Sequence, residues 1–300
     1  MDTNILLETG TNELEVLEFL VAGNSYGINV AKIKEIIPYQ AVTPVPNAHP
    51  SIEGIFMPRD KMITAIDLRN CLALGSSQPG GLFIITNFNN LDIAFHVDSV
   101  MGIHRVSWMD IINPDKTIAD VQDGVSTGII KIDGKLIIIL DFERIVTFIN
   151  PNTGLKSEDI DAMEGNDDRS KYNILIAEDS LLLNSLIVGC LEKAGYNKIT
   201  STRNGKECYD KVMEFLENGT LDKKVNLIIT DIEMPLMDGH HLIKLLKENS
   251  DTNHIPIIIF SSLVNDEMRR KGEQLGADGQ LSKPEIGELV NLIDGFLLKE

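Results

Sequence analysis

The spacing of hydrophobic and polar positions changes near residue 150. Before that point, short apolar segments with a loose two-residue alternation are separated by Gly, Asn and Pro, a pattern typical of β-hairpins. Beyond residue 171, short apolar runs alternate with longer amphipathic stretches, which is typical of parallel strands joined by helices. The pattern therefore predicts an all-β domain followed by an α/β domain.

A hairpin that occurs twice is the most informative feature of the first part. Residues 54–56 are followed after four residues by 61–68, and residues 128–130 are followed after four residues by 135–142. Each copy predicts a strand, a tight turn and a second strand that leads into a short helix capped by an aspartate. Regularly spaced short strands with Gly-containing turns favour two similar small β-barrels packed together.

Two further hairpins and one short helix are predicted in the same part. The hairpins pair residues 13–22 with 26–30, and 82–88 with 91–97. Residues 31–37 are predicted to form one or two helical turns, because Ile33, Ile36 and Ile37 fall on one side of a helix.

The two copies of the repeated hairpin differ at the turn. The second has Asp133-Gly134, an ordinary tight-turn pair. The first has Arg59-Asp60 within Met57-Pro58-Arg59-Asp60, and turn geometry does not require an arginine there. We therefore expect Arg59 to contact a partner. A solvated arginine is the alternative.

A serine motif in the first part suggests a different function. Residues 23–27 match the G-x-S-x-G pattern of serine hydrolases. That chemistry needs the serine on a strand-to-helix turn, with a histidine and an acid behind it. Both flanks of Ser25 are predicted as strands, so we interpret Ser25 as a hairpin residue.

The acidic composition restricts the class of partner. The 300 residues carry a formal net charge of −18. This charge argues against nucleic acid, whose phosphates would repel the protein, and favours partners with basic surfaces or metal cations. Three widely spaced cysteines match neither a zinc pattern nor a disulfide framework. The acidic N-terminus does not resemble a signal peptide and no apolar run is long enough to span a bilayer, so we expect a cytoplasmic protein without direct membrane insertion.

An acidic segment, residues 151–171, separates the predicted domains, 1–150 and 172–300. It has few apolar groups, and its carboxylates repel one another, so it predicts an extended, mobile linker. Nothing in it fixes ligand geometry, so we do not interpret it as a cation site.

Polar side chains follow four of the predicted strands of the second domain. In strand order they are Glu178 and Asp179, then Asp231, then Ser261 and Ser262, and finally Lys283. Because the carboxyl ends of parallel strands meet at one edge of a sheet, we expect these side chains to converge on one crevice. The neighbouring His240 and His241 open a predicted helix and are expected at the surface.

These residue types together favour phosphoryl chemistry. Clustered carboxylates repel one another without a cation, and hard oxygen ligands suit Mg²⁺. A lysine supplies a point charge for one phosphate oxygen and a serine hydroxyl donates a hydrogen bond to another. An aspartate next to a metal can accept a phosphoryl group as an acyl phosphate. Taken alone, Asp231 has an alternative interpretation as a loop residue that caps the next helix.

The first part resembles the CheW coupling domain of bacterial chemotaxis. The matching residues keep the family's order and spacing over nearly the whole part: 26–30, 35–37, 43–46, 54–59, 65–68, 97–98 and 127–141. The resemblance implies two SH3-like five-stranded barrels that bridge a chemoreceptor cytoplasmic tip and the histidine kinase CheA. Arg59 falls on the family's arginine at its turn, with Asp60 in place of the usual glycine. His96 stands where the family favours a small or apolar residue, and we expect it to be partly buried without a ligand role.

The second part, residues 171–300, closely resembles the response-regulator receiver domain, which implies a flavodoxin-like (βα)5 fold. The resemblance implies that Asp231 is the phosphoryl acceptor. It implies that Glu178 and Asp179 are the acid pair for Mg²⁺, with the backbone carbonyl of Glu233 as a further ligand. The Glu233 side chain either alters access of the hydrolytic water or is a solvated loop residue.

The same resemblance assigns the remaining strand-end residues. Ser261 matches the switch hydroxyl, Ser262 the small position after it, and Lys283 the phosphoryl-binding lysine. The family also implies a cis peptide bond before Pro284. Gln280 stands where many receivers carry a Tyr or Phe that moves inward with the switch hydroxyl, so the usual aromatic readout is absent.

A CheW-like domain followed by a receiver is the arrangement of the CheV coupling proteins. It implies a phosphorylation-regulated scaffold of two-component signalling at receptor arrays, which joins chemoreceptors to CheA. It implies no enzyme activity beyond Mg²⁺-dependent self-phosphorylation from a phosphohistidine and self-dephosphorylation. The alternative is a phosphate sink that drains the kinase, with the first part serving only for localisation.

Overall fold

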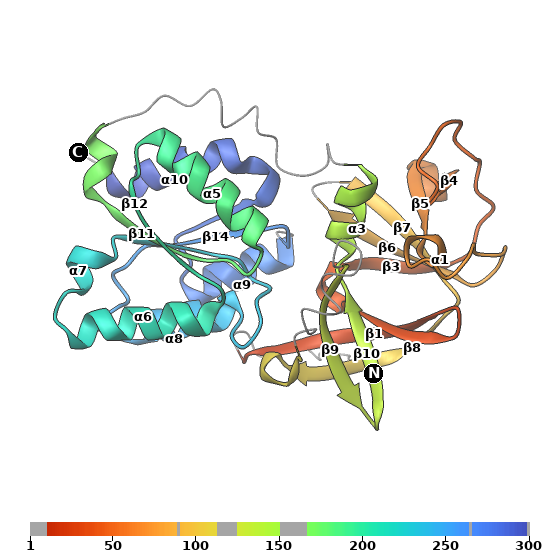
Figure 1. Ribbon diagram of the computed structural model, residues 1–300, viewed down its shortest axis with the longest axis horizontal. Helices are drawn as coiled ribbons and strands as arrows, with labels where there is room; N and C mark the ends of the chain where they lie inside the picture. The colour runs from red at the N-terminus through yellow and green to blue at the C-terminus, as the bar shows by residue number, and fades with distance from the viewer. Residues whose placement is uncertain (1–10, 89–90, 113–124, 151–166, 264–265, 299–300) are drawn as a thin grey trace. The chain divides into compact units, whose positions relative to one another are not determined.

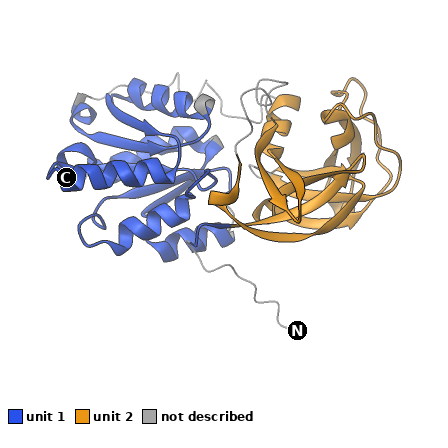
Figure 2. Ribbon diagram, turned by 60° about the horizontal axis from the view of Figure 1, so that its bottom comes forward, with its two compact units in different colours: residues 1–13, 155–300 blue, residues 14–154 orange. Residues whose placement is uncertain are grey.

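A computed structural model of the chain describes residues 11–88, 91–112, 125–150, 167–263 and 266–298. The chain divides into two compact units, shown in Figure 2. Unit 2 comprises Leu14–Gly154, and unit 1 comprises Leu155–Glu300 together with the N-terminal segment Met1–Glu13. Most of the predicted linker lies outside the described residues.

Unit 2 is built from two five-stranded sheets (Figure 1). One has the strand order β8-β1-β2-β10-β9 and the other β3-β6-β7-β5-β4. Their bounds are β1 Glu13–Val21, β2 Asn24–Asn29, β3 Ile33–Pro38, β4 Ile52–Phe56, β5 Ile63–Asp67, β6 Leu82–Phe88, β7 Leu91–Val97, β8 Ser99–Ser107, β9 Ser126–Ile132 and β10 Lys135–Leu140. Short helical segments are η1 Val30–Lys32, η2 Pro58–Asp60, η3 Trp108–Asp110, α1 Leu68–Cys71 and α3 Phe142–Ile149.

The repeated hairpin is present twice, as β4–β5 and β9–β10, and each copy leads into a helix. Asp67 caps α1 by accepting from the Arg69 and Asn70 amides, and Asp141 caps α3 by accepting from the Arg144 amide. Both caps are local interactions within three residues, which is why the sequence predicts them.

The prediction of helix over residues 31–37 is wrong. Only Val30–Lys32 forms a 3-10 turn, and the chain continues as the edge strand β3. Antiparallel pairing with β6 supplies the backbone hydrogen bonds of β3, so Ile33 and Ile37 face inward while Ile36 is exposed. The two isoleucines that fit a helical face also fit the two-residue period of a strand, and pairing decides between them.

Unit 1 contains a parallel sheet with the order β12-β11-β13-β14-β15, covered by α5 and α10 on one face and by α6, α8 and α9 on the other (Figure 1). The strands are β11 Asn173–Ala177, β12 Lys198–Thr202, β13 Leu227–Thr230, β14 Ile257–Ser261 and β15 Gly279–Ser282. The helical segments are η5 Asp167–Lys171, α5 Leu181–Ala194, α6 Gly205–Glu217, α7 Leu221–Lys224, α8 Gly239–Glu248, α9 Asp266–Leu275, η6 Lys283–Glu285 and α10 Ile286–Leu297. The predicted fold class, all-β followed by α/β, is confirmed.

Residues 167–171, predicted as the end of the linker, form the 3-10 turn η5 and belong to unit 1. Arg169 makes a bidentate ion pair with Asp294 at 3.0 and 2.6 Å, and donates to the Ala194 carbonyl at 2.7 Å. A bidentate ion pair between an arginine and a carboxylate fixes the geometry of both groups, and here it orders the segment that precedes β11.

Candidate functional site

Asp231 directly follows the central strand β13, which pairs with β11 on one side and β14 on the other. All four residues of β13 are buried, as expected for a strand covered on both faces. The Asp231 side chain is buried, and its Oδ1 accepts from the Ile232 amide at 2.6 Å. The strand order reverses direction between β11 and β13, which is where open α/β sheets bind ligands.

Three carboxylates meet at this edge of the sheet. One oxygen each from Glu178, Asp179 and Asp231 lies within 4.8 Å of the others. Glu178 is buried and Asp179 is exposed. Burial raises the pKa of Glu178 well above its ordinary value, and the neighbouring aspartates raise it further against the lowering effect of Lys283. The cluster therefore concentrates negative charge at this edge of the sheet, with two of its three carboxylates buried.

Lys283 supplies the positive charge that the structure shows at this cluster. Its Nζ lies 2.6 Å from Asp231 Oδ2 and 3.4 Å from Glu178 Oε2. The lysine opens η6, where Ser282 and Glu285 form a reciprocal capping box that fixes the turn. One ammonium group against three carboxylates leaves net negative charge, so a divalent cation with oxygen preference fits the donor set.

Pro284 occupies the first turn of η6, where a proline fits because its missing N–H would have no intrahelical partner there. The cis peptide bond that the receiver family implies before Pro284 stays a prediction.

The two serines lie on the neighbouring strand end. Ser261 is the last residue of β14 and is buried, and its Oγ accepts from the Leu263 amide at 3.2 Å. Ser262 follows at intermediate exposure. Glu233, whose carbonyl is the expected further ligand, lies two residues beyond Asp231 and is also of intermediate exposure. The structure therefore places all of these residues at or just after the carboxyl ends of adjacent strands.

Gln280 lies inside the unit, bound to a helix. Its side chain is buried, and Nε2 donates to the Arg269 carbonyl of α9 at 2.7 Å. Gly272 of α9 permits this approach, because a Cβ there would lie 2.6 Å from Gln280 Nε2. At this position the side chain joins β15 to α9.

The expectation that His240 lies at the surface is wrong. Its side chain is buried, and burial lowers its pKa to about 4, so the imidazole is neutral near pH 7. His240 lies in the first turn of α8, on the buried side of the helix. Helix N-termini are often exposed, but here the preceding loop folds over the turn: Gly239 N donates to the Ile232 carbonyl at 2.9 Å.

Sequence reasoning missed the way in which Asp238 and Gly239 shape this loop. Asp238 caps α8 by accepting from the His241 amide at 2.8 Å, and burial raises its pKa to about 6. A Cβ at position 239 would lie 2.0 Å from the Asp231 carbonyl oxygen. The Asp-Gly pair at the helix start was the available signal, because only glycine allows this close backbone approach.

In unit 2, Arg59 lies at the tip of the first hairpin. Both Arg59 and Asp60 adopt left-handed φ angles, 52° and 63°, which is uncommon for residues with a Cβ. The Arg59 side chain is 79% exposed, yet its guanidinium lies 2.6 Å from Glu35 Oε2 of β3. Met57 and Met62 beside it are also exposed. The expectation of a partner contact at Arg59 stays a prediction.

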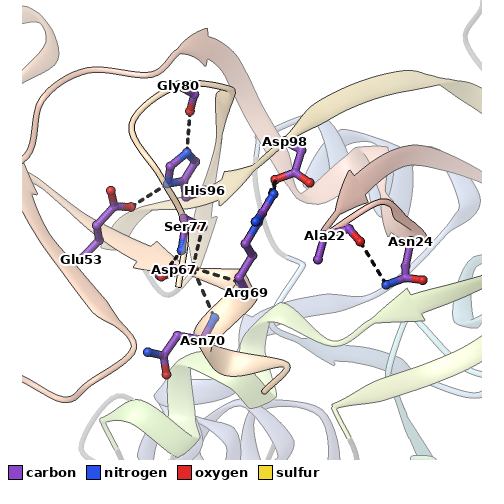
Figure 3. A network of polar contacts seen from close by, with 10 residues as sticks. All are labelled: Ala22, Asn24, Glu53, Asp67, Arg69, Asn70, Ser77, Gly80, His96 and Asp98. Carbon is purple, nitrogen blue, oxygen red and sulfur yellow. Dashed lines mark hydrogen bonds and ion pairs between the residues drawn. The ribbon is translucent and has the colours of Figure 1, made fainter. Parts of the chain in front are cut away.

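Figure 3 shows a network of polar contacts in unit 2 that includes His96 and Asp67. The buried His96 ring faces two acceptors, Glu53 Oε2 at 2.8 Å and the Gly80 carbonyl at 2.6 Å. Burial lowers the pKa of His96, but these two hydrogen bonds outweigh burial and raise the pKa above its ordinary value. Asp67 binds both the amide and the hydroxyl of Ser77 in the same loop. His96 therefore holds a loop in place.

The environment of Ser25 does not suit a hydrolase. Its hydroxyl donates to Glu18 Oε1 at 2.8 Å, and Glu18 Oε2 lies 2.7 Å from His104 Nε2. The carboxylate stands between serine and histidine, whereas an activated serine needs the histidine next to it. Ser25 also lies within β2.

Comparison with known proteins matches both halves of the chain. Residues 15–149 match the CheW-like domain family, and residues 174–294 match the response regulator receiver domain family. The chain is 30% identical to chemotaxis protein CheV3 of Helicobacter pylori over 96% of both chains. It is 30% identical to CheV2 of the same organism, covering 89% of this chain and 88% of the relative. It is also 28% identical to chemotaxis protein CheW of Thermotoga maritima, over 50% of this chain and 98% of the relative.

Within the described residues, no helix has the length and apolar character needed to cross a membrane.

Proposed function

Because the chain belongs to the CheV family of chemotaxis proteins and is an adaptor with a receiver domain, we propose that phosphorylation of Asp231 regulates its coupling activity. The coupling itself joins chemoreceptor tips to the histidine kinase CheA through the CheW-like domain, which places the adaptor at receptor arrays in the cytoplasm. The kinase is both partner and phosphoryl donor.

The juxtaposition of Asp231, Glu178, Asp179 and Lys283 carries the proposal. Mg²⁺ would be held by the three carboxylates and the Glu233 carbonyl, and would supply charge neutralisation for the incoming phosphoryl oxygens. Lys283, already 2.6 Å from Asp231, binds another of those oxygens, and the Ser261 hydroxyl donates a hydrogen bond to a third. This set fits phosphoryl transfer better than metal storage, because the reacting carboxylate is itself one of the ligands.

In the transfer step, a carboxylate oxygen of Asp231 attacks the phosphorus of a phosphohistidine. The bond from phosphorus to the histidine nitrogen breaks as the new oxygen–phosphorus bond forms, and the donor leaves as neutral imidazole when its other nitrogen carries a proton. The acyl phosphate adds about −1.5 to −2 charges near neutral pH. Lys283 then exchanges a carboxylate partner for a phosphoryl oxygen, which changes the loops that surround the site.

Arg59 is the proposed contact in the CheW-like domain. Its exposure, the two exposed methionines beside it and the ion pair with Glu35 together present a fixed guanidinium to a partner. Arginine is suited to this role because its planar group makes paired hydrogen bonds with a carboxylate. Substitution of Arg59 by alanine is expected to reduce kinase coupling while leaving phosphorylation of Asp231 intact.

The test measures assembly of receptor, kinase and adaptor with and without acetyl phosphate and Mg²⁺. The wild-type chain is expected to gain one phosphoryl group by intact mass and to change its affinity in the ternary complex. Asp231→Asn is expected to do neither, whereas the exposed Asp251→Asn is a matched control that does both. Phosphorylation without any change in ternary affinity would instead support the phosphate sink, in which self-dephosphorylation drains the kinase.

A further inference from the structure

The side chain of Asn12 binds the loop that follows Asp231. Its Nδ2 donates to the Leu236 carbonyl at 2.9 Å, and its Oδ1 accepts from the Asp238 amide at 3.0 Å. The two bonds use both ends of one carboxamide, and they connect residues 224 and 226 positions apart in the sequence. Asn12 itself is 9% exposed and belongs to the same compact unit as the loop.

Asn12 provides a hydrogen-bond partner that the loop needs. Leu236 has a left-handed φ of 66°, which a branched side chain disfavours, so local preference does not hold the loop in this shape. Asp238 is buried, and without Asn12 its amide would lose its acceptor. Between these two residues, the Met237 carbonyl accepts from Gly205.

A short series of contacts connects Asn12 to the phosphorylation site. The amide bound by Asn12 precedes Gly239, whose own amide donates to the Ile232 carbonyl at 2.9 Å. The Ile232 amide in turn donates to Asp231 Oδ1 at 2.6 Å. Gly239 also packs against the Asp231 carbonyl so closely that no Cβ fits. The loop therefore cannot change shape at Asp231 without affecting the bonds to Asn12.

Asn12 is joined covalently to the first residue of β1. Asn12 has a left-handed φ of 61° and is followed at once by β1, whose residues from Leu14 onward belong to unit 2. The chain thus passes from the loop contact within two residues into β1, which pairs with a neighbour on each side in one sheet of the CheW-like domain.

We propose that Asn12 is a positioning residue for the phosphorylation site, and that its two bonds convey the state of Asp231 to the start of β1. The proposal rests on the proposed phosphorylation of Asp231. By linkage, a bond whose strength depends on phosphorylation must alter phosphorylation by the same free energy when it is removed. Asn12 therefore affects both the site and the strand.

The test compares Asn12→Gly with Asn47→Gly in the full chain. Glycine accepts a left-handed φ without strain, so the first substitution removes only the side-chain bonds. Asn47 is a matched control, because it is exposed and has a similar φ of 59°. Asn12→Asp keeps the acceptor for the Asp238 amide and loses the donor to Leu236.

The probe is beryllofluoride with Mg²⁺, followed by ¹⁹F NMR titration and by hydrogen exchange of backbone amides. Asn12→Gly is expected to change beryllofluoride affinity and acyl-phosphate lifetime by about fivefold or more, within the usual range of coupling between sites. In wild type, beryllofluoride should alter exchange at residues 13–16, and in Asn12→Gly it should not. Asn12→Asp should restore part of the protection at Asp238, and Asn47→Gly should match wild type.

The outcomes separate the two proposals. If wild type binds beryllofluoride but Asn12→Gly and Asn12→Asp match it in affinity, lifetime and exchange at residues 13–16, the role of Asn12 is overturned while phosphorylation of Asp231 stands. If wild type neither binds beryllofluoride nor accepts a phosphoryl group, the proposed function fails first, and the role of Asn12 fails with it.

Discussion

Replacing Asp92 by asparagine tests how unit 2 holds the hairpin that carries Arg59. Asp92 on β7 is buried, and its Oδ2 lies 2.7 Å from Lys34 Nζ and 2.6 Å from Lys61 Nζ. Asn87 donates to its other oxygen. Lys34 on β3 precedes the glutamate that pairs with Arg59, and Lys61 directly follows the turn, so one carboxylate connects β3 to the end of the hairpin turn.

The magnitude follows from the pKa of Asp92. Burial raises this pKa, but the two lysines and Asn87 outweigh burial and lower it from 3.8 to about 2. At about 1.4 kcal/mol per pKa unit, this difference corresponds to about 2.5 kcal/mol. The lysine side chains are 47% and 55% exposed, and solvent screening reduces the expected loss to about 1 kcal/mol.

The pH dependence gives the sharper test. Because the folded pKa of Asp92 lies below the unfolded value, its contribution is complete above pH 3.8 and is lost as the pH falls toward 2. The single tryptophan, Trp108, is buried in unit 2, so urea unfolding followed by its fluorescence reports on this unit. Asp92→Asn should unfold at lower urea than wild type at pH 7, with a difference that shrinks below pH 4. Equal midpoints at pH 7, or a difference that persists unchanged at pH 3, would refute the reasoning.

Three further predictions concern other parts of the chain. His96→Gln should lower the stability of unit 2 by about 2 kcal/mol below pH 6.5, the usual loss for hydrogen bonds to a charged group. Because the folded pKa of His96 is raised, the stability advantage of the wild type should fade as the pH rises through that pKa. Urea unfolding followed by Trp108 fluorescence measures both the loss and its pH dependence. Gly239→Ala should destabilise unit 1 by about 2 kcal/mol or more in circular dichroism melts, because the new Cβ would clash with the backbone at Asp231. The control Gly189→Ala, in α5 with open space around it, should instead increase the stability by up to about 1 kcal/mol. Lys283→Met should slow phosphorylation by acetyl phosphate about 100-fold, the usual loss for one charge-stabilising group, while Asp231 still binds Mg²⁺; an unchanged rate would exclude Lys283 from the transfer step.

Much of the candidate site was predictable because the rule that places it is topological. Asp231 ends an apolar run, and parallel pairing puts the carboxyl ends of neighbouring strands at one edge. Glu178 and Lys283 therefore had to approach it, whatever the details of the loops. The charge imbalance that favours Mg²⁺ follows from residue types alone. The distances in the structure then show that these charged groups lie within a few ångströms of one another.

The predictions that failed depended on the environment of a residue and not on its type. Residues 31–37 suit a helix or a strand equally well in sequence, and the strand formed because β6 offered hydrogen bonds. His240 looked like a surface residue at a helix start, but the loop before it closes over that turn. For residues 31–37 the deciding contact comes from a strand far away in the sequence, and for His240 it comes from the way in which the preceding loop folds.

The sequence by itself determined the two domains, the hairpins with their aspartate caps, and the set of strand-end residues, because these follow from short-range periodicity and from the geometry of parallel strands. Tertiary structure alone decided the partners of Asp92, the pair of acceptors around His96 and the clamp of Asn12 on the loop after Asp231. Those contacts join residues that lie far apart in the chain, so a buried polar group finds its partner only once the fold has brought the two together.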